Sequence, residues 1–352
     1  MLRRTLADDS CVTRTLPLFA LCAAAAVADP LTFATATGIV GREERSRIEA
    51  GGAVVSVVSA RKPDFAAFGL AQTKAPPPRL IAWSRTIEHL YRGTYVPVIG
   101  RFSTQPRLDD LSSLRLDPDD LNDLRECRPG DCGVKLSAVE IGRIRGAASA
   151  AGEYWQEATL GAFREVLLTR AQSYLASGLA AAPPYFDQEQ PISPQREYAQ
   201  VAARIGLEPM YGSQALPYFD AYPHGDARGV ESFLYWSKET LGGGKPIVSI
   251  THVAIFSSTT EPVPYAMTAA RQVYASHYLD ASLSFTIIVD GEVAPQYLVY
   301  MRRLRTDAFE GAFGWLIRGI VERRIRAEGP ALMNALRRKL EGSDPPISDS
   351  ES

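Results

Sequence analysis

Two histidines, His252 and His277, have the side chains in this 352-residue chain best suited to proton transfer or metal binding. His252 alternates with Ile250 in one apolar run and His277 alternates with Leu279 in another, which predicts that both lie on inward faces of strands. Imidazole changes charge near neutral pH and is a common metal ligand. Because no third ligand stands at a suitable spacing, neither a metal nor a cofactor is predicted. Ligand contact, acid-base chemistry and a structural role in the core all stay open.

Aromatic and polar residues are interleaved in neighbouring strand-like runs. Tyr235 and Trp236 lie in the segment Tyr-Trp-Ser-Lys-Glu, and Tyr274 opens the segment Tyr-Ala-Ser-His-Tyr-Leu-Asp. On a strand, such side chains either pair with those of neighbouring strands or line a ligand pocket. In a catalytic interpretation, the proton-transfer partner of a histidine would be Lys238, Glu239 or Asp280. The serines of both segments lack the flanking glycines of a nucleophile elbow, which argues against a serine hydrolase.

Cys127 and Cys132 are the cysteines expected in the mature protein. The chain has four cysteines, and the other two lie in an N-terminal segment that is predicted to be removed. Pro129 and Gly130 favour a turn that brings the two sulfur atoms together, and an oxidising compartment preserves the bond. A redox pair usually has two intervening residues, and no histidine is near enough in the sequence to complete a zinc site. A local structural disulfide is therefore predicted.

The first 28 residues have the pattern of an export signal. Basic residues precede an apolar run from Leu16 to Val27, and Ala26-Val27-Ala28 fits a cleavage site. The protein is therefore expected in the periplasm or outside the cell, with an uncleaved membrane anchor as the alternative. The formal net charge of -2 argues against nucleic acid as a partner, because binding to its backbone needs a dominant basic face.

The elements that must position these residues lie in the last third of the chain. Runs of aromatic and β-branched residues predict antiparallel strands at 232–238, 247–256, 270–289 and 296–304. From there the period changes to that of a helix with a row of apolar side chains on one face: Phe309, Phe313, Leu316, Ile317, Ile320, Val321 and Ile325. We expect this row to face the sheet, where Phe313 and Leu316 would contact a ligand.

Further strands and a helix are predicted in the first third of the chain. A segment rich in predicted helices separates them from the strands of the last third. The predicted parts are a signal peptide at 1–28, a first sheet segment at 29–106, a helical insert at 107–229, a second sheet segment with the C-terminal helix at 230–341, and a disordered tail at 342–352. The insert carries both cysteines. These parts predict an α+β fold with an antiparallel sheet, a mainly helical insert and a long C-terminal helix.

The order of these elements resembles the START or SRPBCC helix-grip superfamily. The resemblance is carried by 66–102, where a strand, Pro76-Pro77-Pro78, a helix around Trp83 and Val98-Ile99-Gly100 follow one another, and by 232–340. It is a similarity of element order, because the superfamily has no short diagnostic motif. It implies a curved antiparallel sheet that grips the C-terminal helix, with an apolar cavity between them. The sequence also resembles exported bacterial proteins of uncharacterised function.

Three functions follow as hypotheses. The first is an exported binding protein for an apolar small molecule or lipid, with contacts from His252, His277, Tyr235, Trp236, Tyr274, Phe313 and Leu316. The second is an enzyme on the same scaffold that uses His252 or His277 for proton transfer. The third is a protein-interaction module of the cell envelope. Peripheral contact with anionic lipid is a further expectation for the basic side of the last helix, at Arg318, Arg323, Arg324 and Arg326.

Overall fold

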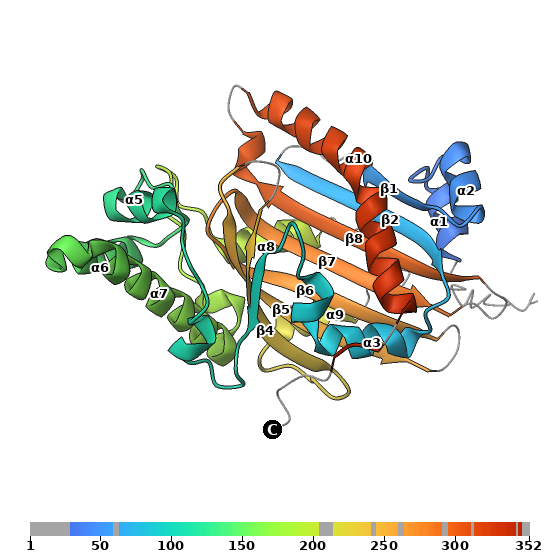
Figure 1. Cartoon of the computed structure of the whole chain (residues 1–352), viewed down its shortest axis with the longest axis horizontal. Helices are drawn as coiled ribbons and strands as arrows, with labels where there is room; N and C mark the ends of the chain where they lie inside the picture. Colours follow the sequence, from blue (N-terminus) through green and yellow to red (C-terminus); the bar gives the residue numbers. More distant parts are fainter. Residues whose placement is uncertain are drawn as a thin grey trace, which may run out of the picture.

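The computed structural model describes residues 29–58, 63–203, 214–240, 244–259, 264–290, 295–310, 313–342 and 344–346. Within these residues the chain forms an α+β fold with one curved, eight-stranded antiparallel sheet and a long C-terminal helix (Figure 1). The predicted fold class is therefore confirmed. The predicted signal peptide, and residues 347–352 of the predicted tail, lie outside the described residues.

The element bounds agree closely with most of the predicted ranges. The strands are β1 (Ala53–Val58), β2 (Asp64–Thr73), β3 (Val98–Arg101), β4 (Glu231–Glu239), β5 (Ile247–Ser258), β6 (Tyr265–Ala275), β7 (Leu279–Val289) and β8 (Gln296–Thr306). The α-helices are α1 (Pro30–Ala36), α2 (Arg42–Glu49), α3 (Pro77–Arg85), α4 (Ile87–Tyr91), α5 (Pro118–Glu126), α6 (Ala138–Ala150), α7 (Trp155–Ser177), α8 (Pro194–Ala202), α9 (Ala215–Ala221) and α10 (Gly314–Glu341).

A single sheet contains strands from both ends of the chain. Its order is β1-β2-β8-β7-β6-β5-β4-β3, and neighbouring strands are antiparallel. The strand β2 pairs with β8 along its whole length, from Asp64 opposite Arg305 to Thr73 opposite Gln296. At the other edge, β3 pairs with β4. The prediction that the two sheet segments combine into one sheet is confirmed.

The prediction of a single strand at 270–289 is wrong, because this segment forms parts of two strands that are joined by a tight turn. The strand β6 ends at Ala275, β7 begins at Leu279, and Tyr278 between them has a φ of 60°. A residue in the left-handed region lets the chain reverse direction within a short turn. His277 therefore lies in this turn and not on a strand, and the residue opposite His252 is Arg271.

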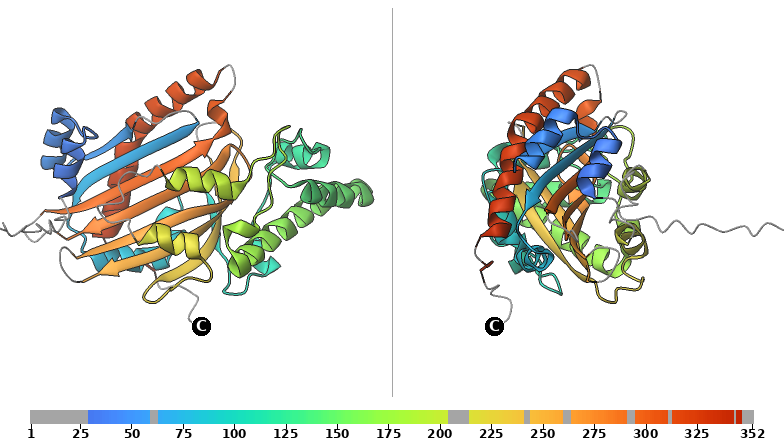
Figure 2. Two further views of the ribbon diagram at one scale, coloured as in Figure 1. Left: turned by 180° about the vertical axis from the view of Figure 1, so that it is seen from behind. Right: turned by 90° about the vertical axis from the view of Figure 1, so that its right-hand side faces the viewer.

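Helices lie on both faces of the sheet (Figures 1 and 2). Across β2, β8, β7 and β6, neighbouring strands pair at Gly69, Tyr300, Thr286 and Thr268, and we call the side of the sheet on which these residues lie the front face. The residues that alternate with them along each strand lie on the back face. On the front face, α10 contacts β1 and β2, while α3 contacts β5, β6 and β7. The helices α8 and α9 lie on the back face, seen in the left view of Figure 2.

The helix α10 turns a different side to the sheet from the one predicted. Phe309, just before the helix, is buried, but Phe313, Leu316, Ile317 and Ile320 are 70%, 46%, 40% and 54% exposed. The prediction that these four side chains face the sheet is therefore wrong. A second helical stripe, of buried and half-buried residues, lies toward the body of the protein: Val321, Ile325, Gly329, Met333, Leu336 and Leu340.

Two glycines explain why α10 packs on this second stripe. A Cβ atom at Gly329 would lie 2.9 Å from Cβ of Val55 on β1, so the helix backbone is very close to that strand. On β2, a Cβ atom at Gly69 would lie 3.2 Å from Sδ of Met333. Such close approach requires glycine. Pro330 lies inside α10, and the helix bends along its length in Figure 1.

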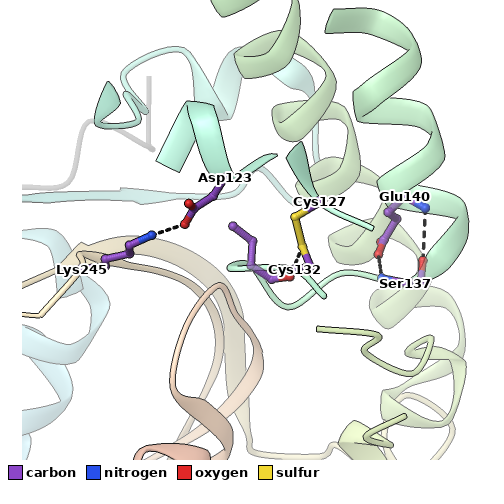
Figure 3. The surroundings of a disulfide bond; sticks show 7 residues. Asp123, Cys127, Cys132, Ser137, Glu140 and Lys245 are labelled. Atoms are coloured by element: carbon purple, nitrogen blue, oxygen red, sulfur yellow. Dashed lines mark hydrogen bonds and ion pairs between the residues drawn. A yellow bond between two sulfur atoms is a disulfide. The ribbon is translucent and has the colours of Figure 1, made fainter. Parts of the chain in front are cut away.

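The helical insert, with α5, α6 and α7, projects from one end of the sheet in Figure 1. At the end of α5, the sulfur atoms of Cys127 and Cys132 lie within disulfide bonding distance, and the Cα atoms are 4.4 Å apart (Figure 3). In the same view, Lys245 forms an ion pair with Asp123 of α5. This contact joins the insert to the segment that leads into β5.

Candidate functional site

His252 lies on the back face inside an aromatic enclosure. Its fully buried ring contacts four other rings, those of Tyr174, Tyr218, Phe219 and Tyr222. Burial lowers the pKa of His252 well below its usual value, and the nearby Arg271 lowers it further, so the imidazole is neutral at pH 7. Arg271 donates to the Tyr174 hydroxyl, which lies 2.6 Å from Nδ1 of His252. His252 is thus held as a neutral residue of the core.

His277 lies apart from His252 and has different neighbours. Its Nε2 atom is 3.2 Å from Oδ1 of Asp120 on α5, and both side chains are buried. Because His277 is in the turn after β6 while His252 is within β5, the structure does not bring the two predicted histidines together. His277 instead connects the sheet to the insert.

A buried ion cluster lies close to the turn that contains His277. Lys135, whose backbone N–H donates to the carbonyl of Ser276 in that turn, contacts Asp280, Asp307 and Asp187 at 2.9, 2.6 and 3.0 Å. Burial lowers the pKa of Lys135, but the three carboxylates outweigh this effect and raise it above its usual value. Burial raises the pKa of Asp280 to about 7, although Lys135 acts in the opposite direction. Asp280, a predicted proton-transfer partner, is therefore part of this cluster.

Tyr274 and Trp236 also lie on the back face. The guanidinium of Arg170 is 4.7 Å from the Tyr274 ring centroid and pairs with Glu140 at 2.6 Å. Both residues of that ion pair, but not Tyr274, line a cavity of about 210 Å³ between α6, α7 and β6. Trp236 is fully buried and donates from Nε1 to the carbonyl of Asp110 at 2.8 Å. These two aromatic residues pack the core around the insert.

Tyr235 faces the opposite way, into a group of polar side chains on the front face. We call this group the front polar cluster: Tyr91, Tyr235, Glu239, Tyr300 and Arg302. Hydroxyl and amide side chains of the same face surround it: Ser237, Ser249, Thr251, Gln272, Ser282, Ser284 and Thr286. So many polar groups on an inner sheet face are unusual, because burying a polar group costs free energy unless it finds a partner.

Strand register places the members of the front polar cluster. In β4, Tyr235 and Glu239 are separated by Ser237, so that all three point to the front face. Oε1 of Glu239 accepts hydrogen bonds from Oγ of Ser237 and of Ser249 on β5, both at 3.0 Å. On β8, Nε of Arg302 donates to Oγ of Ser282 on β7 at 3.0 Å. Each charged side chain is thus oriented by hydroxyl groups of its own or the neighbouring strand.

Long side chains of β4 and β8 interact electrostatically across the front face, although three strands lie between these two in the sheet. Burial opposes the charge on Arg302, but Tyr300, Glu239 and Tyr235 raise its pKa above the usual value. Burial also raises the pKa of Tyr91 to about 12, and it raises that of Tyr235 further. At pH 7 the cluster therefore combines the guanidinium cation of Arg302 with the protonated phenols of Tyr91 and Tyr235.

This arrangement has the parts of a recognition site for a polar molecule. The guanidinium binds a carboxylate or phosphate group in a planar, two-bond geometry. Glu239 accepts hydrogen bonds, and the neutral phenols of Tyr91 and Tyr235 can donate or accept them. Among the described residues, no group of three or more His, Cys, Asp or Glu side chains is arranged to hold a metal ion.

Sequence reasoning found two members of the front polar cluster and missed three. Tyr235 and Glu239 stood out because their strand is rich in aromatic and polar residues. Arg302, Tyr91 and Tyr300 were not identified as site residues from the sequence. The overlooked signal is the alternation in β8, where Leu298, Tyr300 and Arg302 occupy one face.

No protein-family model matches this chain, and no curated protein or solved structure is significantly similar to it. None of the described helices is both long and apolar enough to cross a membrane.

Proposed function

We propose that this protein is a binding protein of the helix-grip type whose ligand is a small, polar organic acid. The observation that carries the proposal is the half-buried Arg302, which shares the front face of the sheet with the phenols and the carboxylate of the front polar cluster. The element order and the long helix on the front face support the resemblance to the START or SRPBCC superfamily. The ligand would contact the cluster between β4 and β8.

The charges of the cluster define the chemical class of the ligand. Arg302 requires an anionic group, for which a carboxylate is the simplest partner. Glu239 would repel a second anion, so a hydroxyl or ammonium group should lie at that end of the ligand. A hydroxy acid or an amino acid satisfies both requirements.

An apolar molecule or lipid is a less suitable ligand for these side chains. It would take Arg302 and Glu239 out of contact with water without offering them a hydrogen bond, and that desolvation costs free energy. The histidines give little support to an enzyme, because His252 lies on the back face and His277 in a turn. Proton transfer through either residue would have to occur away from Tyr235.

Thermal unfolding in the presence of candidate ligands tests the proposal. Hydroxy acids and amino acids would be compared with their neutral amides and with fatty acids. A ligand at a hundred times its Kd adds about 2.7 kcal/mol to the stability of the folded state. We expect an acid of one of the first two classes to raise the Tm, and the corresponding amide to have little effect.

Two substitutions assign the effect to the front polar cluster. Arg302→Met should weaken binding of the stabilising acid roughly thirtyfold, which corresponds to about 2 kcal/mol. Glu239→Gln keeps the shape of the side chain and should weaken binding of a ligand that donates to it. Arg145, exposed on α6, offers the matched control Arg145→Met. Stabilisation by fatty acids alone, unchanged in both cluster variants, would refute the proposal and favour a lipid ligand.

A further inference from the structure

We propose that the N-terminal half of α10 docks on an anionic lipid surface. Four large apolar side chains form what we call the outer row of this helix: Phe313, Leu316, Ile317 and Ile320. Their spacing of three, four and seven residues places them on one side of the helix. This inference concerns a surface separate from the front polar cluster and does not depend on the proposed ligand.

The outer row is exposed because the packing of α10 fixes its orientation. Close approach at Gly329 to Val55 and at Gly69 to Met333 places that side of the helix on the sheet, and the outer row lies on another side. Trp315, in the first turn of the helix, is 65% exposed as well. Single exposed apolar residues are common on protein surfaces, but a continuous group of large ones marks a site of contact.

Charges next to the outer row indicate what it contacts. About one turn beyond Ile320, the same side of the helix carries Arg323, which is exposed, and Arg324, whose side chain is 41% exposed. The acidic residues Glu322 and Glu328 are less exposed than Phe313 or Trp315, and both form ion pairs with arginines of α10. The charge on the outer side is therefore mainly basic, which complements anionic headgroups.

An anionic lipid surface fits this helix better than a second copy of the chain. In a symmetric dimer the outer row would meet itself, so Arg323 and Arg324 of one copy would find no acidic group on the outer row of the other. Phosphate groups of lipids offer such partners beside an apolar phase. Tryptophan also favours the interface between water and lipid, where Trp315 would lie. A helix with this distribution binds parallel to the membrane surface.

Vesicle flotation of the full chain tests the inference. Vesicles of phosphatidylcholine with phosphatidylglycerol provide the anionic surface, and vesicles of phosphatidylcholine alone provide the neutral one. We expect the protein to float with the anionic vesicles at low salt and to be released in part at high salt, because salt screens the arginines. Tryptophan emission should shift to shorter wavelength as Trp315 leaves water.

The variants separate the outer row from the rest of the helix. Phe313→Gln combined with Leu316→Gln should weaken binding to anionic vesicles at least about tenfold, because two large apolar groups no longer enter the lipid. Its Tm should be unchanged, because both side chains are exposed in the folded protein. Leu332→Gln, at a residue 50% exposed outside the row, is the matched control. Arg323→Gln should weaken binding about fivefold.

Three results would overturn the inference. The first is no flotation with either kind of vesicle. The second is flotation that the double variant and Arg323→Gln leave unchanged. The third is a dimer, seen by light scattering in the absence of lipid, that the double variant dissociates, since a second copy would then cover the outer row.

Discussion

Asp280 is the side chain through which pH should change the stability of this protein. Burial is the main cause that raises its pKa to about 7, and the nearby Asp307 and Asp187 add to the effect. In an unfolded chain the pKa of aspartate is about 4. Between about pH 4 and pH 7 the folded protein therefore holds this proton more tightly than the unfolded chain does. The stabilisation is fully present below this range and is lost as the pH rises through it.

Asp280→Asn should remove this pH dependence, because the amide keeps an acceptor for Lys135 but does not titrate. Urea unfolding of both proteins at a series of pH values from about 5 to about 8 gives the measurement. The free energy of unfolding of the wild type, relative to the variant, should fall by on the order of a few kcal/mol. A relative free energy that is constant or rises over this range would contradict the prediction.

At the residue scale, sequence patterns identified side chains that could do chemistry but not which of them meet. His252 and Tyr235 were both predicted to line one pocket, yet they lie on opposite faces of the sheet. Opposite Ile250 and Thr251 of β5, the strand β6 has one extra residue, Val273, and this bulge changes the side chain alternation of β6. A sequence does not contain the register of its strands, so the partners of Arg302 could not be inferred.

The crossing of α10 over β1 yields a prediction at the scale of the element. Gly329→Ala should destabilise the protein by about 1 to 3 kcal/mol, because the new methyl group would overlap with Val55. Gly319 is the matched control, since a Cβ atom there has no neighbour within 4 Å. Gly319→Ala should stabilise the helix by about 0.5 to 1 kcal/mol. Chemical denaturation measures both changes, and equal effects would refute the close approach.

Periodicity predicted the existence and length of α10 but not its orientation. The helix carries two apolar stripes, one through Phe313 and Ile320 and the other through Ile325 and Met333. The expected core face combined the first stripe with Val321 and Ile325, and only these last two belong to the stripe that lies toward the sheet. The second is selected because it contains Gly329, where the backbone can approach the sheet. A glycine within an apolar stripe thus indicates close packing of the helix backbone. An analysis that counts only large apolar residues does not detect this signal.

At the scale of the whole molecule, the order of elements was sufficient to predict that the sheet is built from both ends of the chain. Turn-forming residues and the lengths of apolar runs predicted most of the strands. The helical insert was predicted because the spacing of apolar residues changes from a strand period to a helix period between the two sheet segments. The tight turn at Tyr278 was missed because it lacks glycine or proline. The placement of Tyr235 on β4 and Arg302 on β8 on the same face depends on the register of all the strands between them.

Because the sheet is continuous, removing a buried side chain between α10 and the sheet should destabilise the entire molecule. Met333 is 4% exposed and contacts β2 beside Gly69, and β2 pairs along its whole length with β8 of the second sheet segment. Met333→Ala should therefore lower the free energy of unfolding by about 2 to 5 kcal/mol. Because the strands share one sheet, circular dichroism and tryptophan fluorescence should give coincident transitions.

Leu332→Ala is the matched control, because Leu332 is the preceding residue of the same helix and is 50% exposed. Truncation of an exposed side chain should change the stability by no more than about 0.5 kcal/mol. If Leu332→Ala proved the more destabilising of the two, α10 would have to present its other side to the sheet. The orientation of α10, with Met333 and not Leu332 toward β2, would then be wrong.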